Sequence, residues 1–63
     1  MYTVCYMGLF ATEYDNRDRA IEGAEQRARN NPEQEIDVLD SDGNTIISLY
    51  YDPIDKRIVS RGQ

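Results

Sequence analysis

The side chains that could take part in chemistry are mostly carboxylates, tyrosines and one thiol. The chain contains no histidine, and Cys5 is its only cysteine. Without histidine, nucleophiles of the Ser-His and Cys-His type are excluded, and so are the common zinc sites. Cys5 lies in an apolar stretch, away from any predicted helix N-terminus, where the pKa of a thiol would fall. We expect a small buried side chain there; a reactive or dimer-linking thiol is the alternative.

The segment Asp40–Asn44, with the sequence Asp-Ser-Asp-Gly-Asn, invites comparison with a calcium-binding loop. An EF-hand loop needs an oxygen ligand at its first position and a glutamate at its twelfth. Those positions are occupied by Val38 and Leu49, so the segment is interpreted as a hairpin turn. The four glycines are isolated, which excludes a glycine-rich phosphate loop. Carboxylate pairs need a pocket for acid–base work, and 63 residues leave little room for one. We therefore predict no catalytic, cofactor or metal site.

Charge is distributed unevenly along the chain, whose formal net charge is -5. Residues 13–29 mix acids and arginines, and residues 56–61 are basic. Between residues 30 and 55 there are seven acids and no lysine or arginine: Glu33, Glu35, Asp37, Asp40, Asp42, Asp52 and Asp55. Turn geometry accounts for Asp40 and Asp42 but not for the acids that precede them. A surface of one sign would steer association with a basic protein.

Tyrosines are the second group of candidate contact residues. Tyr50 and Tyr51 lie in a predicted strand, where tyrosine suits a sheet core or a protein interface. Stacking on single-stranded bases is the less favoured alternative, because it needs a basic groove. The predicted partner-binding set is Glu33, Glu35, Asp37, Asp40, Asp42, Tyr50 and Tyr51.

Two elements are predicted for the first half of the chain. Residues 2–10 are rich in β-branched and aromatic types and predict one interior strand; one face would carry Tyr2, Val4, Tyr6 and Phe10, and the other Thr3, Cys5, Met7 and Leu9. A helix is predicted near residues 16–30, capped by Asp15 and ended before Pro32. Its apolar stripe is Ala20, Ile21, Ala24 and Ala28, with Ile21 as the expected anchor and Gly23 as a local defect.

The second half predicts strands and turns. Residues 34–40 alternate as a half-buried strand, and residues 45–51 form the next strand after the Asp-Gly turn. One face of residues 45–51 would carry Ile47, Leu49 and Tyr51, and the other Ile46, Ser48 and Tyr50. Residues 52–55 are a second turn, residues 56–60 a charged edge strand, and residues 61–63 a frayed end. The fold class is α+β in the order β-α-β-β(-β), a single domain over residues 1–63 with one helix on one face of a mostly antiparallel sheet of three or four strands.

The pattern resembles a set of small bacterial and phage domains of unknown function. The residues that carry the resemblance are Ala24 to Asn31, at the end of the helix, and Ile36 to Tyr51, a strand, an Asp-Gly turn and another strand. The resemblance implies the same β-α-β-β fold.

These observations favour a non-catalytic module that binds a basic protein surface. The narrower form is a phage- or mobile-element-type inhibitor, similar to anti-CRISPR proteins in size and charge, that blocks a nuclease or another nucleic-acid-binding protein. The alternative is a self-associating structural domain, a homodimer that buries the uncovered sheet face. Direct binding to nucleic acid or membrane needs a basic surface and is not expected. No apolar run approaches the ~20 residues of a membrane span, no signal peptide is apparent, and an unpaired cysteine suits the cytoplasm.

Overall fold

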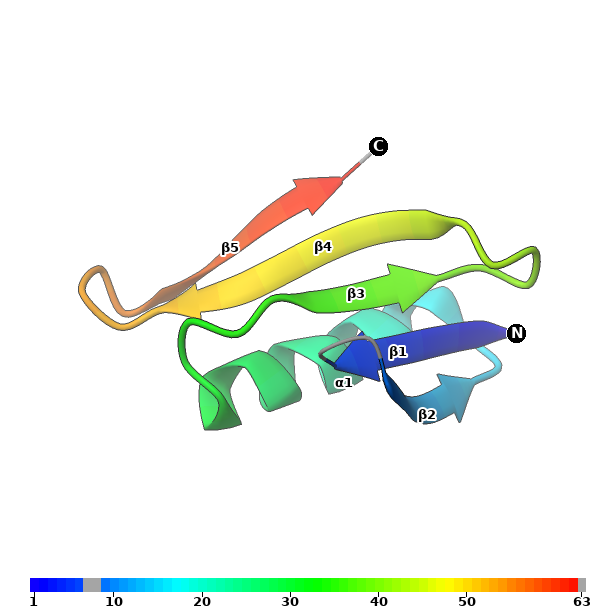
Figure 1. The fold of residues 1–63 in the computed structure, drawn as a ribbon, viewed down its shortest axis with the longest axis horizontal. Helices are drawn as coiled ribbons and strands as arrows, with labels where there is room; N and C mark the ends of the chain where they lie inside the picture. The colour runs from blue at the N-terminus through cyan, green and yellow to red at the C-terminus, as the bar shows by residue number, and fades with distance from the viewer. Residues whose placement is uncertain (7–8, 63) are drawn as a thin grey trace.

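One helix lies on a sheet of five strands in the computed structural model, which describes residues 1–6 and 9–62, with the backbone alone at residues 9–11 (Figure 1). Within these residues the sheet order is β2-β1-β3-β4-β5, and every neighbouring pair is antiparallel. The predicted α+β class is confirmed. The elements are β1 (Tyr2–Tyr6), β2 (Leu9–Tyr14), α1 (Arg17–Asn30), β3 (Ile36–Leu39), β4 (Thr45–Asp52) and β5 (Arg57–Gly62).

The fifth strand comes from the segment that was predicted to form one strand over residues 2–10, and that prediction was wrong. β2 runs back along β1, with Tyr14 opposite Tyr2 and Leu9 opposite Tyr6. The residues on both sides of Gly8 are equally apolar, so the sequence shows no polar turn between the two strands. β1 is interior, between β2 and β3, as predicted. The predicted faces of Met7, Gly8, Leu9 and Phe10 lie outside the described side chains.

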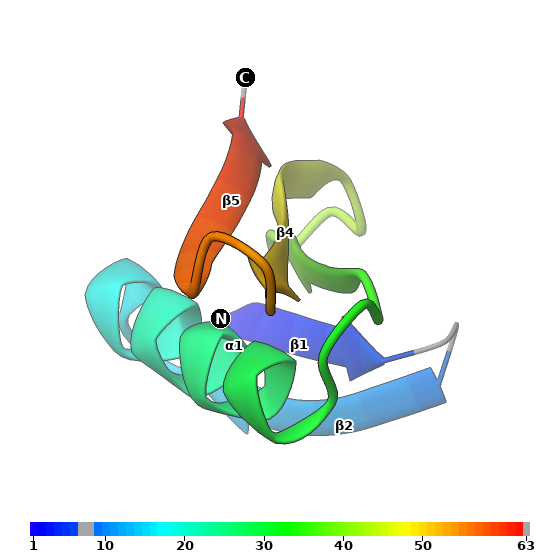
Figure 2. The same cartoon turned by 90° about the vertical axis from the view of Figure 1, so that its left-hand side faces the viewer.

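The path of α1 follows from the strand directions. β2 and β3 are both antiparallel to β1 and lie on either side of it, so they run in the same direction. A chain that leaves β2 and enters β3 has to cross β1, and α1 makes this crossing. Figure 2 shows α1 along one face of the sheet, which curves around the helix. The other face of the sheet has no helix over it in the described part of the chain.

The ends of α1 are fixed by two asparagines. The side chain of Asn16 accepts hydrogen bonds from the backbone N–H groups of Asp18 and Arg19, at 2.8 and 3.3 Å, so Asn16 and not the predicted Asp15 is the N-cap. Both residue types cap well, and the sequence could not separate neighbouring candidates. At the other end, Asn31 donates to the carbonyl oxygen of Arg27 and accepts from the hydroxyl of Tyr6. Tyr6 thereby connects the helix C-terminus to the end of β1.

The core is a row of alanines against four aliphatic side chains. Ala20, Ala24 and Ala28 are fully buried on one stripe of α1, since residues four apart lie on the same helix face. They contact a sheet face whose fully buried side chains are Val4, Ile36, Val38 and Leu49. Ile21, predicted as the anchor, is only half-buried, so close approach of the alanine row holds the helix to the sheet.

The structure explains why a glycine occupies position 23 of the helix, which the sequence alone did not. The ring of Tyr14, at the end of β2, lies directly over this turn of the helix. A Cβ atom at position 23 would be 2.6 Å from Cζ of Tyr14 and nearer still to its hydroxyl oxygen. The predicted defect is therefore a packing site, because only glycine leaves space for the tyrosine ring.

An irregularity in β4 changes which side chains face the helix. The register between β3 and β4 shifts at Val38/Leu39, so that Val38 lies opposite Ile47 while Leu39 lies opposite Thr45. Ile46 is the extra residue of this bulge. It packs against the core together with Ile47, which corrects the prediction that Ile46 shares a face with Ser48 and Tyr50.

The turns confirm the remaining sequence assignments with one exception. Between β3 and β4, the Asp40 carboxylate accepts from the N–H groups of Asp42 and Asn44, and Gly43 has a φ of 85°. Between β4 and β5, the Asp52 carboxylate accepts from the N–H of Ile54. β5 is an edge strand, as predicted, but it extends to Gly62, so residues 61 and 62 are paired with β4 instead of frayed. No helix in the described residues has the length and apolar character to cross a membrane.

Because Tyr14 packs over Gly23, a substitution that normally stabilises a helix is predicted to destabilise this protein. Gly23→Ala should lower the free energy of unfolding by about 1–3 kcal/mol through overpacking, although alanine favours a helix by about 1 kcal/mol over glycine. In a Tyr14→Val background the same substitution should instead stabilise the protein by up to about 1 kcal/mol. Urea unfolding of the four proteins measures both effects. Stabilisation by Gly23→Ala in the parent chain would contradict the packing.

The position of the core makes a second prediction. Ile36→Ala should cost about 2–5 kcal/mol, because the side chain is fully buried. Ile21→Ala should cost less than half as much, because Ile21 keeps part of its surface in water in the folded state. The two variants remove the same atoms, so chemical denaturation of each isolates burial as the cause. Equal losses would show that Ile21 anchors the helix after all.

Candidate functional site

The candidate site is the sheet face opposite α1, which we call the open face. Directly paired residues of antiparallel strands point to the same side. The register therefore assigns the open face without reference to the core. Its residues with described side chains are Thr3, Cys5, Glu13, Asp37, Leu39, Thr45, Ser48, Tyr50, Asp52, Arg57, Val59 and Arg61.

Four of these residues form one row across the sheet. Cys5 lies opposite Asp37, Asp37 opposite Ser48, and Ser48 opposite Arg61. The Ser48 hydroxyl donates a hydrogen bond of 2.7 Å to the Asp37 carboxylate. The row places a thiol, a carboxylate, a hydroxyl and a guanidinium on four neighbouring strands.

Arg61 also makes an ion pair that spans β4. Its guanidinium donates to the carboxylate of Glu35, the residue immediately before β3, although β3 and β5 are separated by β4. Both side chains are largely exposed, so the pair contributes little to stability. Its importance is that a positive charge lies within the run of acids that the sequence presents as uninterrupted.

Cys5 is buried, as predicted, with 9% of its surface exposed. Burial raises the pKa of the Cys5 thiol above its ordinary value, and the Asp37 carboxylate beside it raises the pKa further. Both effects disfavour the thiolate, which is the reactive form.

The seven acids of residues 30–55 lie in three groups. Glu35 and Asp37 are at the middle of the open face. Asp40 and Asp42 are in the β3–β4 turn. Asp52, the last residue of β4, and Asp55, in the β4–β5 turn, are at the opposite end of β4 (Figure 1). The eight residues of β4 separate these turns by roughly 25 Å.

Glu33 belongs to the β4–β5 end of the molecule. It adopts a φ of 72°, and its N–H donates to the carbonyl oxygen of Tyr51. At the same end, Arg57 lies 3.7 Å from the carboxylate of Asp55. The structure therefore distributes the predicted acids over three places and puts arginines of β5 beside two of them.

The two predicted tyrosines point to opposite faces of the sheet. Tyr50 is half-buried on the open face and is paired with Val59 of β5. Tyr51 packs against the core on the helix side. Of the predicted partner-binding set, the structure brings Glu35, Asp37 and Tyr50 together on one surface. The arginines of β5 were missed as members of this site; their signal is the alternation Arg57, Val59, Arg61, which puts three residues on one face.

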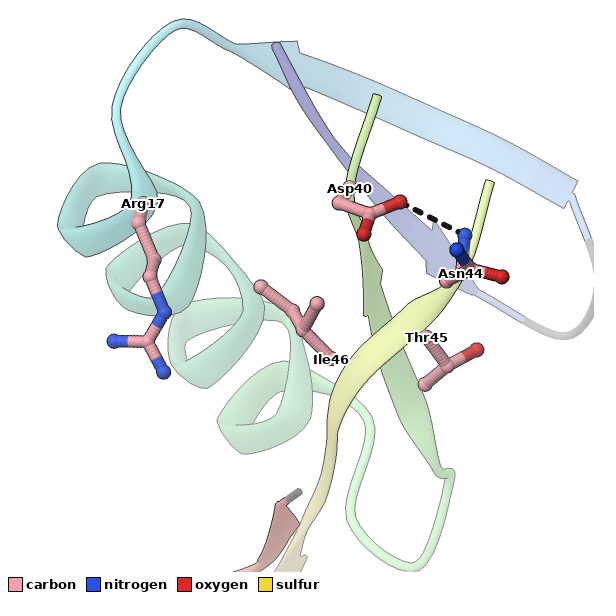
Figure 3. A pocket seen from close by; sticks show the side chains of 5 residues that line it. All are labelled: Arg17, Asp40, Asn44, Thr45 and Ile46. Atoms are coloured by element: carbon pink, nitrogen blue, oxygen red, sulfur yellow. Dashed lines mark hydrogen bonds between the residues drawn. The ribbon is translucent and has the colours of Figure 1, made fainter. Parts of the chain in front are cut away.

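The helix side of the molecule also has a groove, lined by Arg17, Asp40, Asn44, Thr45 and Ile46. It has a volume of about 620 Å³ and lies between the first turn of α1 and the start of β4 (Figure 3). Arg17 and Ile46 are on its two walls, and Asp40 and Asn44 are at its end, where the Asp40 carboxylate already accepts from the turn N–H groups. The groove is polar and open, and no group of three or more His, Cys, Asp or Glu in the described residues could hold a metal ion.

The environment of Cys5 predicts slow thiol chemistry. Because the thiol pKa is raised, alkylation by iodoacetamide at pH 8 should be at least roughly tenfold slower than in the guanidinium-unfolded chain. Asp37→Asn removes the charge that contributes to the shift and should speed alkylation. Stability should fall as pH rises above about 9, because the unfolded chain ionises its thiol first. Mass spectrometry of the labelled chain follows the rate, with Cys5→Ser as the blank, and equal rates in folded and unfolded chains would exclude the raised pKa.

Comparison with known proteins identifies no relative of this chain. No protein-family model, no curated protein and no solved structure matches the chain. The resemblance to small bacterial and phage domains thus stays a prediction, and function has to be argued from the open face itself.

Proposed function

We propose that this chain is a non-catalytic protein-binding module and that the open face is its contact surface. The observation that carries the proposal is the composition of that face around Tyr50. Half-buried Tyr50 is paired with Val59, which Arg57 and Arg61 flank along β5. Carboxylates lie on the other side of Tyr50, at Glu35 and Asp37, and beside Arg57, at Asp52. Aromatic residues and arginine are the types most enriched at the centres of protein interfaces.

The shape of the surface supports a macromolecular partner over a small molecule. Small-molecule sites are concave and enclose most of the ligand, whereas the open face is one side of a sheet that curves around α1 (Figure 2). Charged side chains of both signs surround Tyr50, as the polar rim surrounds the centre of a protein interface.

The narrower function is inhibition of a protein with a basic nucleic-acid-binding site, such as a nuclease. It rests on the net charge of -5 and on the acids at the two ends of β4, Asp40 and Asp42 in one turn and Asp52 and Asp55 at the other end. Rim charges of this kind mainly accelerate association and make it dependent on salt. The cytoplasm is the location that fits such a partner and an unpaired thiol.

A photo-cross-linking experiment tests the proposal while the partner is still unidentified. p-Benzoyl-phenylalanine in place of Tyr50 should cross-link to a protein when the cells that produce the chain are irradiated. The same residue in place of exposed Glu22, on α1, is the matched control and should give no specific product. Mass spectrometry identifies the product. Cross-linking from Glu22 but not from Tyr50 would put the contact surface on the helix and overturn the proposal.

Binding kinetics with the cross-linked protein then separate the two parts of the proposal. Asp42→Lys together with Asp55→Lys should lower the association rate about tenfold or more at low salt if the partner is basic. Tyr50→Ala should mainly raise the dissociation rate, because it removes buried contact area. Stopped-flow or surface-based kinetics over a salt series measures both. An unchanged association rate and salt dependence would reduce the turn acids to a solubilising role.

A further inference from the structure

The acids and arginines of the open face lie on different strands, and this arrangement bears on which partner the face can bind. Glu35 and Asp37 lie just before and on β3, and Arg57 and Arg61 lie on β5. β4 runs between them and carries Tyr50. Around Tyr50 the face thus has acids on the β3 side and arginines on the β5 side. Two further acids lie on the same face, Asp52 at the end of β4, beside Arg57, and Glu13 on β2.

A second copy of the chain can be placed on the open face by a two-fold axis that runs parallel to β4 and above it. The acids of one copy then lie opposite the arginines of the other. Rotation about such an axis lays β4 over β4 of the second copy and exchanges the positions of β3 and β5. Each Arg61 then faces the Glu35 and Asp37 carboxylates of the other copy, and the two Tyr50 rings meet near the axis. Such an interface is isologous and closes at two copies.

We propose that the open face binds a second copy of this chain, with the arginines of β5 in each copy paired with the acids of β3 in the other. This inference rests on the proposed function, since it names the partner of the same face. As the partner of this face, a second copy is an alternative to the basic protein of the narrower function. A uniformly basic partner would meet Arg57 and Arg61 as like charges, and a uniformly acidic one would meet Glu35 and Asp37. A second copy sets the arginines of β5 against the acids of β3 on both sides of β4.

The ion pair between Glu35 and Arg61 within one chain is weak, so it can be replaced by ion pairs between two chains. Glu35 and Arg61 pair within one chain while both remain exposed, and exposed ion pairs contribute little to stability. In the dimer the same groups re-pair between chains beside Tyr50 and Val59, which lose contact with water. The charges set the orientation, and the apolar centre provides the attraction.

The shape of the face limits the strength of the dimer. The sheet curves around α1 (Figure 2), so contact centres on β3, β4 and β5. The buried area is then below the roughly 800 Å² per partner of a standard interface. We expect a dissociation constant of roughly 1–100 µM, weakened by salt.

Complementary charge reversal tests the pairing directly. Arg61→Glu and Glu35→Arg each break the pair within the chain, and each also sets like charges against one another between copies. Both variants should be monomers, with dimer dissociation constants raised at least about tenfold. An equimolar mixture should form a heterodimer with nearly the parent affinity, because only the mixture restores opposite charges across the interface. Sedimentation velocity and native mass spectrometry distinguish these species.

Matched controls remove the effects of net charge and of folding. Glu22→Arg and Arg29→Glu make the same charge changes on exposed positions of α1 and should leave the dimer intact. Circular dichroism verifies the fold, and the double variant Glu35→Arg/Arg61→Glu, which restores both kinds of pair, should dimerise like the parent. If a single variant does not fold, Glu35→Gln and Arg61→Gln replace it and should still weaken the dimer.

The outcomes separate this inference from the proposed function. A parent chain that is monomeric at 1 mM, while position 50 cross-links to another protein, overturns the second copy as partner and leaves the protein-binding proposal standing. A dimer that survives both single reversals, or a mixture that forms no heterodimer, also overturns the inference. A monomer that cross-links to nothing through position 50 overturns both.

Discussion

The close contact between the alanine row of α1 and the sheet is the constraint on which the rest of the structure depends. α1 has to cross β1 to join β2 to β3, and it lies over a sheet only five strands wide. Ala20, Ala24 and Ala28 are fully buried in this crossing, so the helix axis can approach the strands closely. Larger side chains on this stripe would lift the helix and open the space above Val4, Ile36 and Val38. Tyr14 over Gly23 then fixes the middle of the helix, and Tyr6 at Asn31 fixes its C-terminal end.

Because α1 covers one face of the sheet, it also determines which residue types are left for the other face. Most large aliphatic residues of β3 and β4 are on the helix side, which leaves the alternate positions for polar side chains, Leu39 and Tyr50. An acidic run that is continuous along the chain is interrupted in space, because the basic tail returns as β5 and places Arg61 at Glu35. The open face therefore carries charges of both signs.

Much of the fold follows from local patterns, and the failures have specific causes. The helix, β4, the Asp-Gly turn and the charged edge strand β5 could be predicted because periodicity and turn chemistry are local properties. The division of residues 2–10 could not, since apolar residues continue on both sides of Gly8. The bulge that turns Ile46 inward, and the space that Gly23 leaves for Tyr14, depend on neighbours distant in sequence. For the site, alternation placed Tyr50 and Tyr51 on opposite faces, but the position of Arg61 required the register of β5.

The strand order also determines the sequence in which the chain can assemble. β3, β4 and β5 are joined by short turns, whereas β1 pairs with β3 across about 36 residues, Thr3 lying opposite Leu39. Closing a long loop costs conformational entropy before its contacts form. The three C-terminal strands are therefore expected to form the folding nucleus, and β1 with its hairpin and helix to dock afterwards. Substitutions in the Asp40–Asn44 turn would then slow folding, while substitutions at Val4 would mainly accelerate unfolding in a chevron analysis.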